Sequence, residues 1–182
     1  MKKSHILIAF VALLSWSQNT IQAQTFKTAT GIVSFTSKTD YETFEAINNQ
    51  VSAAYSKGKI QFRVPVNAFI FEKKLMQTHF QENYMESAKY PNGSFKGTVI
   101  YPENFKLSTK AQNVRVKGVF NIHGVEKETE ILGSITQTKN GIGLVANFSI
   151  LLSDFNINIP SMAVNKIAPN IDIRVNAELP KK

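Results

Sequence analysis

Two histidines beyond residue 23, His79 and His123, are the side chains best suited to catalysis or metal binding. They lie far apart in the chain, and no HExxH-like pairing accompanies either one. A catalytic zinc site usually takes three protein ligands. We therefore predict no metal and no cofactor, and a structural role for each histidine. His123 follows an alternating segment and precedes Gly124, so we expect it to bond to local backbone in a turn.

Nucleophilic chemistry has no clear signature in the sequence. The 182 residues include no cysteine, and no G-x-S-x-G elbow, phosphate-binding glycine loop or calcium-binding loop is present. Glu126, Glu128 and Glu130 share one face of an expected strand, where like charges face water rather than share a proton. We predict no catalytic residues and a protein that is not an enzyme.

Positive charge predominates, with Lys+Arg 21 against Asp+Glu 13 and a formal net charge of +8. Arg63, Arg115 and Lys117 lack aromatic companions on the expected outward faces, so nucleic acid is not an expected partner. The lysines are scattered, which favours a solvated surface and leaves peripheral contact with anionic membranes as the alternative. We expect a monomer or a homodimer.

Residues 1–23 have the three parts of a secretory signal peptide. Lys2 and Lys3 precede an uninterrupted apolar run, ILIAFVALL, and the small residue Ala23 suits a cleavage site. The run is shorter than the roughly 20 residues that a membrane-spanning helix needs. We therefore expect a signal peptide over 1–23, one domain over 24–182, and export to the periplasm or the medium.

Alternation of apolar and polar residues dominates the rest of the chain and indicates half-buried antiparallel strands. The strictest alternation lies at 59–66, 114–122 and 170–179. Weaker strand signals lie at 26–37, 50–56, 94–101, 127–137 and 142–152. Turn residues such as Lys57-Gly58 and Asn140-Gly141 separate the strands. About eight such strands predict an all-β fold, either a single antiparallel barrel or a sandwich.

Residues 72–84 lose this alternation, and we expect them to form one short helix between strands. Leu75, Met76, His79 and Phe80 recur at helical spacing along one stripe, which Asn83 or Tyr84 would continue, and Pro91 prevents further continuation. We expect the helix to cover one end of the barrel with these four side chains on its underside.

Three glycines, Gly97, Gly118 and Gly133, fall on the apolar faces of expected strands. Mid-strand glycine commonly marks a bend or a close approach of backbone or ligand. An eight-stranded barrel is just wide enough either to be filled by side chains or to hold one small ligand. These glycines therefore indicate either kinks that help the barrel to close or an interior left open for an apolar guest.

Short motifs in a particular order give the sequence a family resemblance. His79-Phe80 is followed by Lys89-Tyr90-Pro91 and a strand that carries Phe95, and then by VKGVFNIHGVEK at 116–127. A later turn, DFNINIP at 154–160, leads to the closing alternating strand. In this order and spacing the chain resembles the YceI-like family. The resemblance implies a lipocalin-like β-barrel, secreted or periplasmic, with no known catalytic residues and, in some members, a polyisoprenoid held in the barrel.

We therefore predict an eight-stranded lipocalin-like β-barrel that binds an apolar or amphipathic chain, an isoprenoid or a lipid, in its lumen. The alternative is a barrel with a filled core that acts through its surface as an envelope or stress-related interaction protein. The expected lumen residues are Phe62, Val64, Phe95, Gly97, Val99, Val116, Gly118, Phe120, Phe148 and Ile173. The expected pocket cover is Leu75, Met76, His79 and Phe80.

Overall fold

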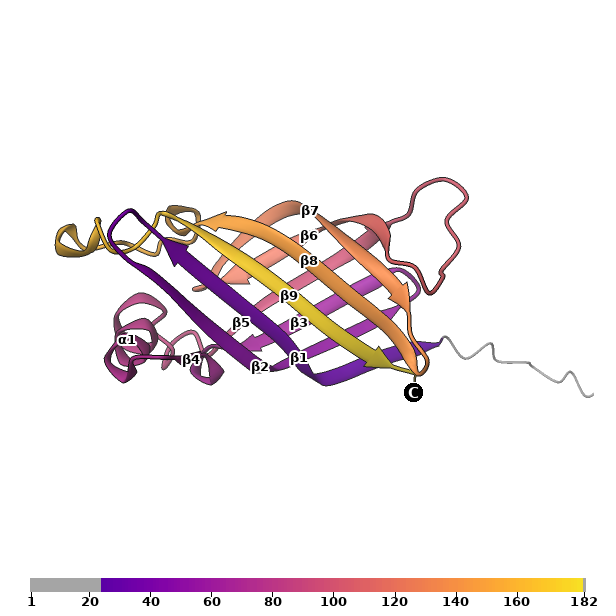
Figure 1. The fold of residues 1–182 in the computed structure, drawn as a ribbon, viewed down its shortest axis with the longest axis horizontal. Coiled ribbons are helices and arrows are strands. Elements are labelled where there is room, and N and C mark those ends of the chain that lie inside the picture. The colour runs from indigo at the N-terminus through magenta and orange to yellow at the C-terminus, as the bar shows by residue number, and fades with distance from the viewer. Residues whose placement is uncertain (1–23, 182) are drawn as a thin grey trace, which may run out of the picture.

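The computed structural model describes residues 24–181 as one closed β-barrel of antiparallel strands (Figure 1). The barrel strands are β1 (Thr25–Lys38), β2 (Thr43–Ser56), β3 (Lys59–Pro65), β5 (Asn92–Ile100), β6 (Gln112–Ile122), β7 (Val125–Gln137), β8 (Gly141–Leu151) and β9 (Asn170–Pro180). They pair in the order β1-β9-β8-β7-β6-β5-β3-β2, and β1 also pairs with β2, which closes the barrel. The predicted eight-stranded antiparallel barrel is confirmed. The expected signal peptide at 1–23 lies outside the described residues.

Short elements gather at one end of the barrel, at the left in Figure 1. They are η1 (Val66–Ala68), β4 (Ile70–Phe71), α1 (Lys74–His79), η2 (Phe80–Tyr84), η3 (Leu152–Phe155) and η4 (Ser161–Ala163). Helix α1 passes directly into η2, a wider π-helical turn, so the helix expected over 72–84 is present but changes its pitch halfway. Within residues 24–181 no helix combines the length and the apolarity needed to cross a membrane.

Strand β2 begins at Thr43, well before the strand that the sequence predicts over 50–56. The sequence misses the first part of this strand because a bulge interrupts its pairing with β1. Gly31 lies opposite Val51, whereas Val33 lies opposite Asn48, so the register shifts between the two pairs. Asn48 and Val51 are both completely buried, and this slip of phase hides the alternation in the sequence. The buried Asn48 amide is satisfied because its Nδ2 donates to the Pro65 carbonyl at 2.7 Å.

The turn between β6 and β7 is the two-residue hairpin His123-Gly124. The φ angles of these residues are 51° and 76°, and a tight hairpin turn of this class needs positive φ at both positions. Lys57-Gly58, between β2 and β3, has the same pair of angles to within a few degrees, at 48° and 76°. The two-residue turn predicted at Lys57-Gly58 is therefore confirmed.

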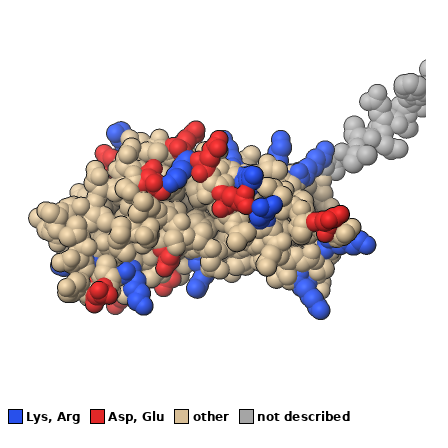
Figure 2. Space-filling view, turned by 90° about the horizontal axis from the view of Figure 1, so that it is seen from above, with Lys and Arg blue, Asp and Glu red and all other residues tan. Residues whose placement is uncertain are grey.

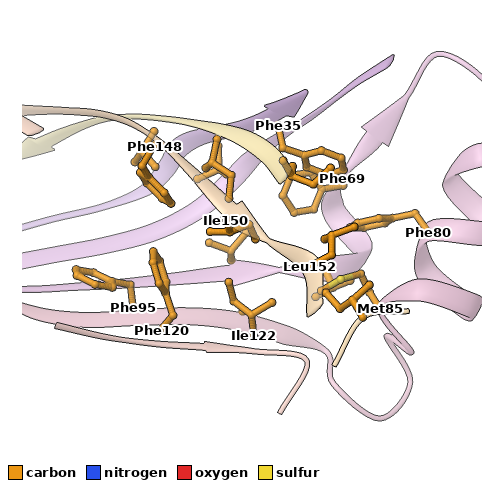
Figure 3. Close-up of a pocket in the computed structure, with 18 of the residues that line it drawn as sticks. Phe35, Phe69, Phe80, Met85, Phe95, Phe120, Ile122, Phe148, Ile150 and Leu152 are labelled. Carbon is orange, nitrogen blue, oxygen red and sulfur yellow. The ribbon is translucent and has the colours of Figure 1, made fainter. Parts of the chain in front are cut away.

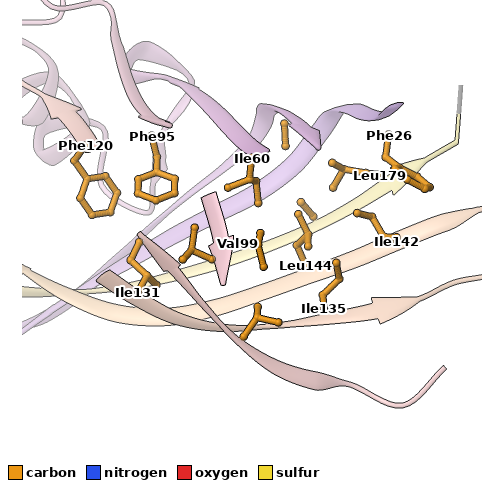
Figure 4. Close-up of a cluster of buried hydrophobic side chains, with 14 of the residues drawn as sticks. Phe26, Ile60, Phe95, Val99, Phe120, Ile131, Ile135, Ile142, Leu144 and Leu179 are labelled. Atoms are coloured by element: carbon orange, nitrogen blue, oxygen red, sulfur yellow. The ribbon is translucent and has the colours of Figure 1, made fainter. Parts of the chain in front are cut away.

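The end of the barrel away from α1 is filled with side chains (Figure 4). Ile142 and Leu179 are completely buried there beside Phe26. Burial of each such side chain stabilises the fold by about 1.5–3 kcal/mol. Tyr55 and Tyr101 are joined by a hydrogen bond between their hydroxyls at the edge of this cluster. Burial, and after it this hydrogen bond, raises the pKa of the Tyr101 hydroxyl above its ordinary value.

Candidate ligand cavity

The other end of the barrel contains a cavity of about 720 Å³ that opens beside α1, whose Met76 and His79 line it. Every one of the eight barrel strands contributes apolar side chains to its wall. The cause is the alternation of the strands, because residues two apart point to the same side of a sheet. Figure 3 shows this wall, with Phe95, Phe120 and Phe148 deep in the barrel and Phe80 and Met85 at the mouth.

Eight of the ten predicted lumen residues line this cavity. They are Phe62, Val64, Phe95, Val99, Val116, Phe120, Phe148 and Ile173. Gln61 and Arg63, on the opposite face of β3, are exposed. The inward register that the sequence predicts for these strands is therefore confirmed.

The two remaining predictions, Gly97 and Gly118, are wrong as sources of open volume. The two glycines lie directly opposite each other on β5 and β6, and neither lines the cavity. A β-carbon on Gly97 would lie 2.8 Å from Cζ of Phe95, and one on Gly118 would lie 2.6 Å from the same atom. The Phe95 ring already occupies the space that these glycines leave. Their role is close packing rather than an open lumen.

A different glycine, Gly93, leaves free space beside the cavity. It lies two residues before Phe95 in the alternation and lines the cavity. The nearest atoms to a β-carbon at Gly93 would be the Asn121 carbonyl oxygen at 3.9 Å and the Val64 carbonyl oxygen at 4.0 Å. These are ordinary contact distances, so Gly93 fulfils the role that the sequence interpretation gave to Gly97 and Gly118.

The helical cover contributes three of its four predicted side chains to the cavity. Met76, His79 and Phe80 line the mouth, whereas Leu75 is 66% exposed and does not reach it, so its predicted role is wrong. The wider turn after Phe80 brings Tyr84 and Met85 into the wall as well. Asn83 and Tyr84, which the sequence offered as continuations of the stripe, both line the cavity. The helical spacing does not continue through a π-helical turn, which is why Met85 was missed.

Phenylalanine side chains that the prediction left out surround the mouth. The Phe80 ring centroid lies between 5.1 and 5.5 Å from those of Phe35, Phe69 and Phe71. Such tilted and edge-on ring pairs contribute about 0.5–1.5 kcal/mol each beyond burial. The spacing of Phe35 from Val33, and of Phe71 from Phe69, is the two-residue signal that could have identified them.

The segment between β8 and β9 forms the side of the mouth that faces α1. Met162, Ala163 and Ile167 of this segment line the cavity. Two hydrogen bonds to the β1 end of the barrel hold the segment in place. The Ala168 amide donates to Ser37 Oγ at 2.9 Å, and Thr39 Oγ1 donates to the Asn165 carbonyl at 2.8 Å. Neither bond follows from local sequence, since 131 and 126 residues separate the partners.

His123 joins the segment after η2 to the segment after β8. Its Nδ1 lies 3.1 Å from the Phe155 carbonyl oxygen, and its Nε2 lies 2.8 Å from Oε2 of Glu86. The imidazole also packs edge-on against the Tyr90 ring, with 4.6 Å between centroids. The prediction of a bond to local backbone is wrong, because the partners are remote in sequence. The interactions that the structure gives His123 are hydrogen bonds and ring packing.

Polar side chains are few at the cavity and lie mainly at its mouth. Lys73, His79, Asn83 and Lys166 are exposed there. Lys73 Nζ forms an ion pair with Glu42 Oε1 at 3.6 Å. Across residues 24–181, no three His, Asp or Glu side chains come together as a set of metal ligands.

Solved structures of low sequence identity have the same fold. A polyisoprenoid binding domain from Saccharophagus degradans, implicated in plant cell wall breakdown, has a TM-score of 0.74 at 14% identity; the match covers 88% of this chain and 99% of that one. Burkholderia cenocepacia BcnA has a TM-score of 0.65 at 17% identity, over 80% of this chain and 94% of that one. The Campylobacter jejuni YCEI protein has a TM-score of 0.58 at 16% identity, over 100% and 91% of the two chains.

Sequence comparison assigns the family. No curated protein matches the chain. The family model for the YceI-like domain matches residues 13–179, which is most of the sequence. The chain therefore belongs to the YceI-like family.

Proposed function

We propose that the protein is an exported binding protein that holds an apolar or amphipathic chain, an isoprenoid or a lipid, inside its barrel. The observation that carries the proposal is the cavity of about 720 Å³, walled by apolar side chains from all eight barrel strands. This volume lies within the roughly 300–1,000 Å³ of ordinary ligand sites. Each methylene group that leaves water for such a wall contributes about 0.8 kcal/mol to binding.

The shape of the site favours a long guest with one polar end. Aromatic and aliphatic side chains run from the mouth down to Phe120 and Ile135, while the filled cluster around Leu179 closes the far end. The longer polar side chains, Lys73, His79, Asn83 and Lys166, lie at the mouth. We infer that an apolar tail enters first and that a polar end stays between α1 and the segment after β8.

The filled-core alternative does not account for this cavity. Only the end around Phe26 and Leu179 has a filled core, and the side chains at the α1 end leave the interior open. The polyisoprenoid binding domain of Saccharophagus degradans shares the fold, which supports the same ligand class for this chain. The signal-peptide pattern at 1–23 supports export to the periplasm or the medium.

Extraction of the purified protein with organic solvent, followed by mass spectrometry, tests the proposal. We expect an isoprenoid or lipid in near-stoichiometric amount. The variant Gly93→Leu places a larger side chain in the free space beside Val64 and is expected to lower the extracted amount several-fold while the barrel stays folded. Lys96→Leu adds the same side chain on the exposed face of the same strand and should leave the amount unchanged. Wild-type protein that carries no chain and takes up none from vesicles would contradict the proposal.

A further inference from the structure

The segment between β8 and β9 ends in an uncharged, exposed tip beside the cavity mouth. Residues 156–165 read NINIPSMAVN and contain no charged side chain. Met162 is 88% exposed and Val164 is 54% exposed. In Figure 2 the leftmost point of the molecule is tan, with blue and red side chains below it and further along the barrel. Exposed apolar side chains are informative where several gather at one place on the surface, because such patches mark interaction sites.

Two more exposed apolar side chains lie at the same end of the barrel. Tyr41, in the turn between β1 and β2, is 79% exposed, and Leu75 of α1 is 66% exposed. The hydrogen bond from Thr39 to the Asn165 carbonyl ties this turn to the tip segment. The Lys73–Glu42 ion pair ties the start of α1 to the same turn. Tyr41, Leu75, Met162 and Val164 therefore lie exposed at the end of the barrel that carries the mouth, and we call these four side chains the apolar rim.

We propose that this apolar rim docks on a lipid bilayer, so that the cavity mouth faces the membrane from which an apolar chain is taken or to which it is given. This inference rests on the proposed function, because only a water-insoluble guest requires such a route. Met162 both lines the mouth and projects into solvent, so the entrance and the apolar rim are continuous. A chain passing from bilayer to barrel would therefore cross an apolar surface.

The size and charge of the rim indicate weak, reversible docking. A single myristoyl chain gives only marginal membrane binding, and the rim offers only a few apolar side chains for burial in a bilayer. Charges of both signs flank it, since Asp40 and Glu42 lie on either side of Tyr41, and Glu72 and Lys74 precede Leu75. We therefore expect docking on phosphatidylcholine vesicles, with only a modest gain when phosphatidylglycerol is added. A carrier that must leave the membrane again needs binding of this strength.

The absence of native cysteine makes a direct test simple. In Val164→Cys, labelled with the environment-sensitive dye NBD, mixing with vesicles should raise the emission and allow quenching by nitroxide-labelled lipids. The control is Leu132→Cys, at a position 69% exposed on the outer wall of β7. Its label should stay in water. In the Val164→Cys background, Met162→Asp should weaken vesicle binding at least about tenfold, the factor expected for losing one buried apolar side chain.

Three results would overturn the docking proposal. The first is a label at 164 that stays in water when vesicles are present. The second is an emission change in the absence of vesicles that grows with protein concentration, because the rim would then be a contact between copies of this chain. The third is equal vesicle binding by the Met162→Asp protein. Solvent extraction of the same wild-type sample separates the two proposals. A bound chain with no insertion overturns docking alone, and insertion with no chain bound or taken up overturns the proposed function alone.

Discussion

The ring of Phe95 lies over Gly118 of the neighbouring strand, with Cζ 2.6 Å from the position that a β-carbon on Gly118 would take. Gly97, directly across the strand pair, lies under the same ring at 2.8 Å. The Phe95 ring also packs at 5.0 Å, between centroids, from Phe120. The absence of side chains on these two glycines thus makes room for the Phe95 ring against the strand pair.

We predict that Gly118→Val lowers the free energy of unfolding by about 3 kcal/mol or prevents folding. Overpacking of a dense interior costs about 1–3 kcal/mol. At Gly118 the backbone of Lys96 also blocks the new side chain. Gly93→Val is the matched control, since its β-carbon would meet ordinary contact distances. Its cost should stay below about 1 kcal/mol. Urea unfolding of the two variants measures the difference. Equal stability of the two variants would show that the Phe95 ring does not depend on the missing side chain at Gly118.

We predict that His123→Ala lowers the free energy of unfolding by about 1–3 kcal/mol, because it leaves the Phe155 carbonyl and the Glu86 carboxylate without their partner. His79→Ala serves as the control, since His79 is exposed on α1 and its loss should change stability by less than about 0.5 kcal/mol. Thermal melting followed by circular dichroism gives both values. If the protein bound a metal ion and the His123→Ala protein did not, the assignment of a purely structural role to His123 would be wrong.

We predict that stability declines in alkaline solution and that Tyr101 causes part of the decline. Burial raises the pKa of Tyr101 in the folded protein, so the neutral hydroxyl is favoured there. The contribution is fully present below the unfolded pKa of about 10 and is lost as the pH rises toward the folded value. Urea unfolding between about pH 9 and pH 11 measures the slope, and Tyr101→Phe should flatten it. An identical slope in Tyr55→Phe and Tyr101→Phe would instead implicate their shared hydrogen bond.

We predict that protein recovered from the envelope or the medium of the producing cell begins at or near Gln24. The reason is the order of positive, apolar and small residues before this position. Intact-mass measurement checks the prediction directly. A mass that corresponds to all 182 residues would contradict it.

Local sequence determined the barrel and most of the cavity wall. Alternation over 59–66, 114–122 and 170–179 places each side chain on one of two faces, because consecutive residues of a strand point in opposite directions. This geometry needs no information from the rest of the chain. Residues such as Phe62, Val116 and Ile173 could therefore be assigned to the interior before their neighbours in space were known.

Tertiary structure alone decided which inward positions are filled and where the cavity opens. Gly93 and Gly118 both point inward, but only the packing of the Phe95 ring distinguishes the free position from the occupied one. Tertiary contacts also decided the register shift at Asn48 and the partners of His123, which are remote in sequence. The mouth depends on contacts between Thr39 and Asn165, which lie 126 residues apart. Periodicity records the direction in which a side chain points, whereas these features depend on what it meets there.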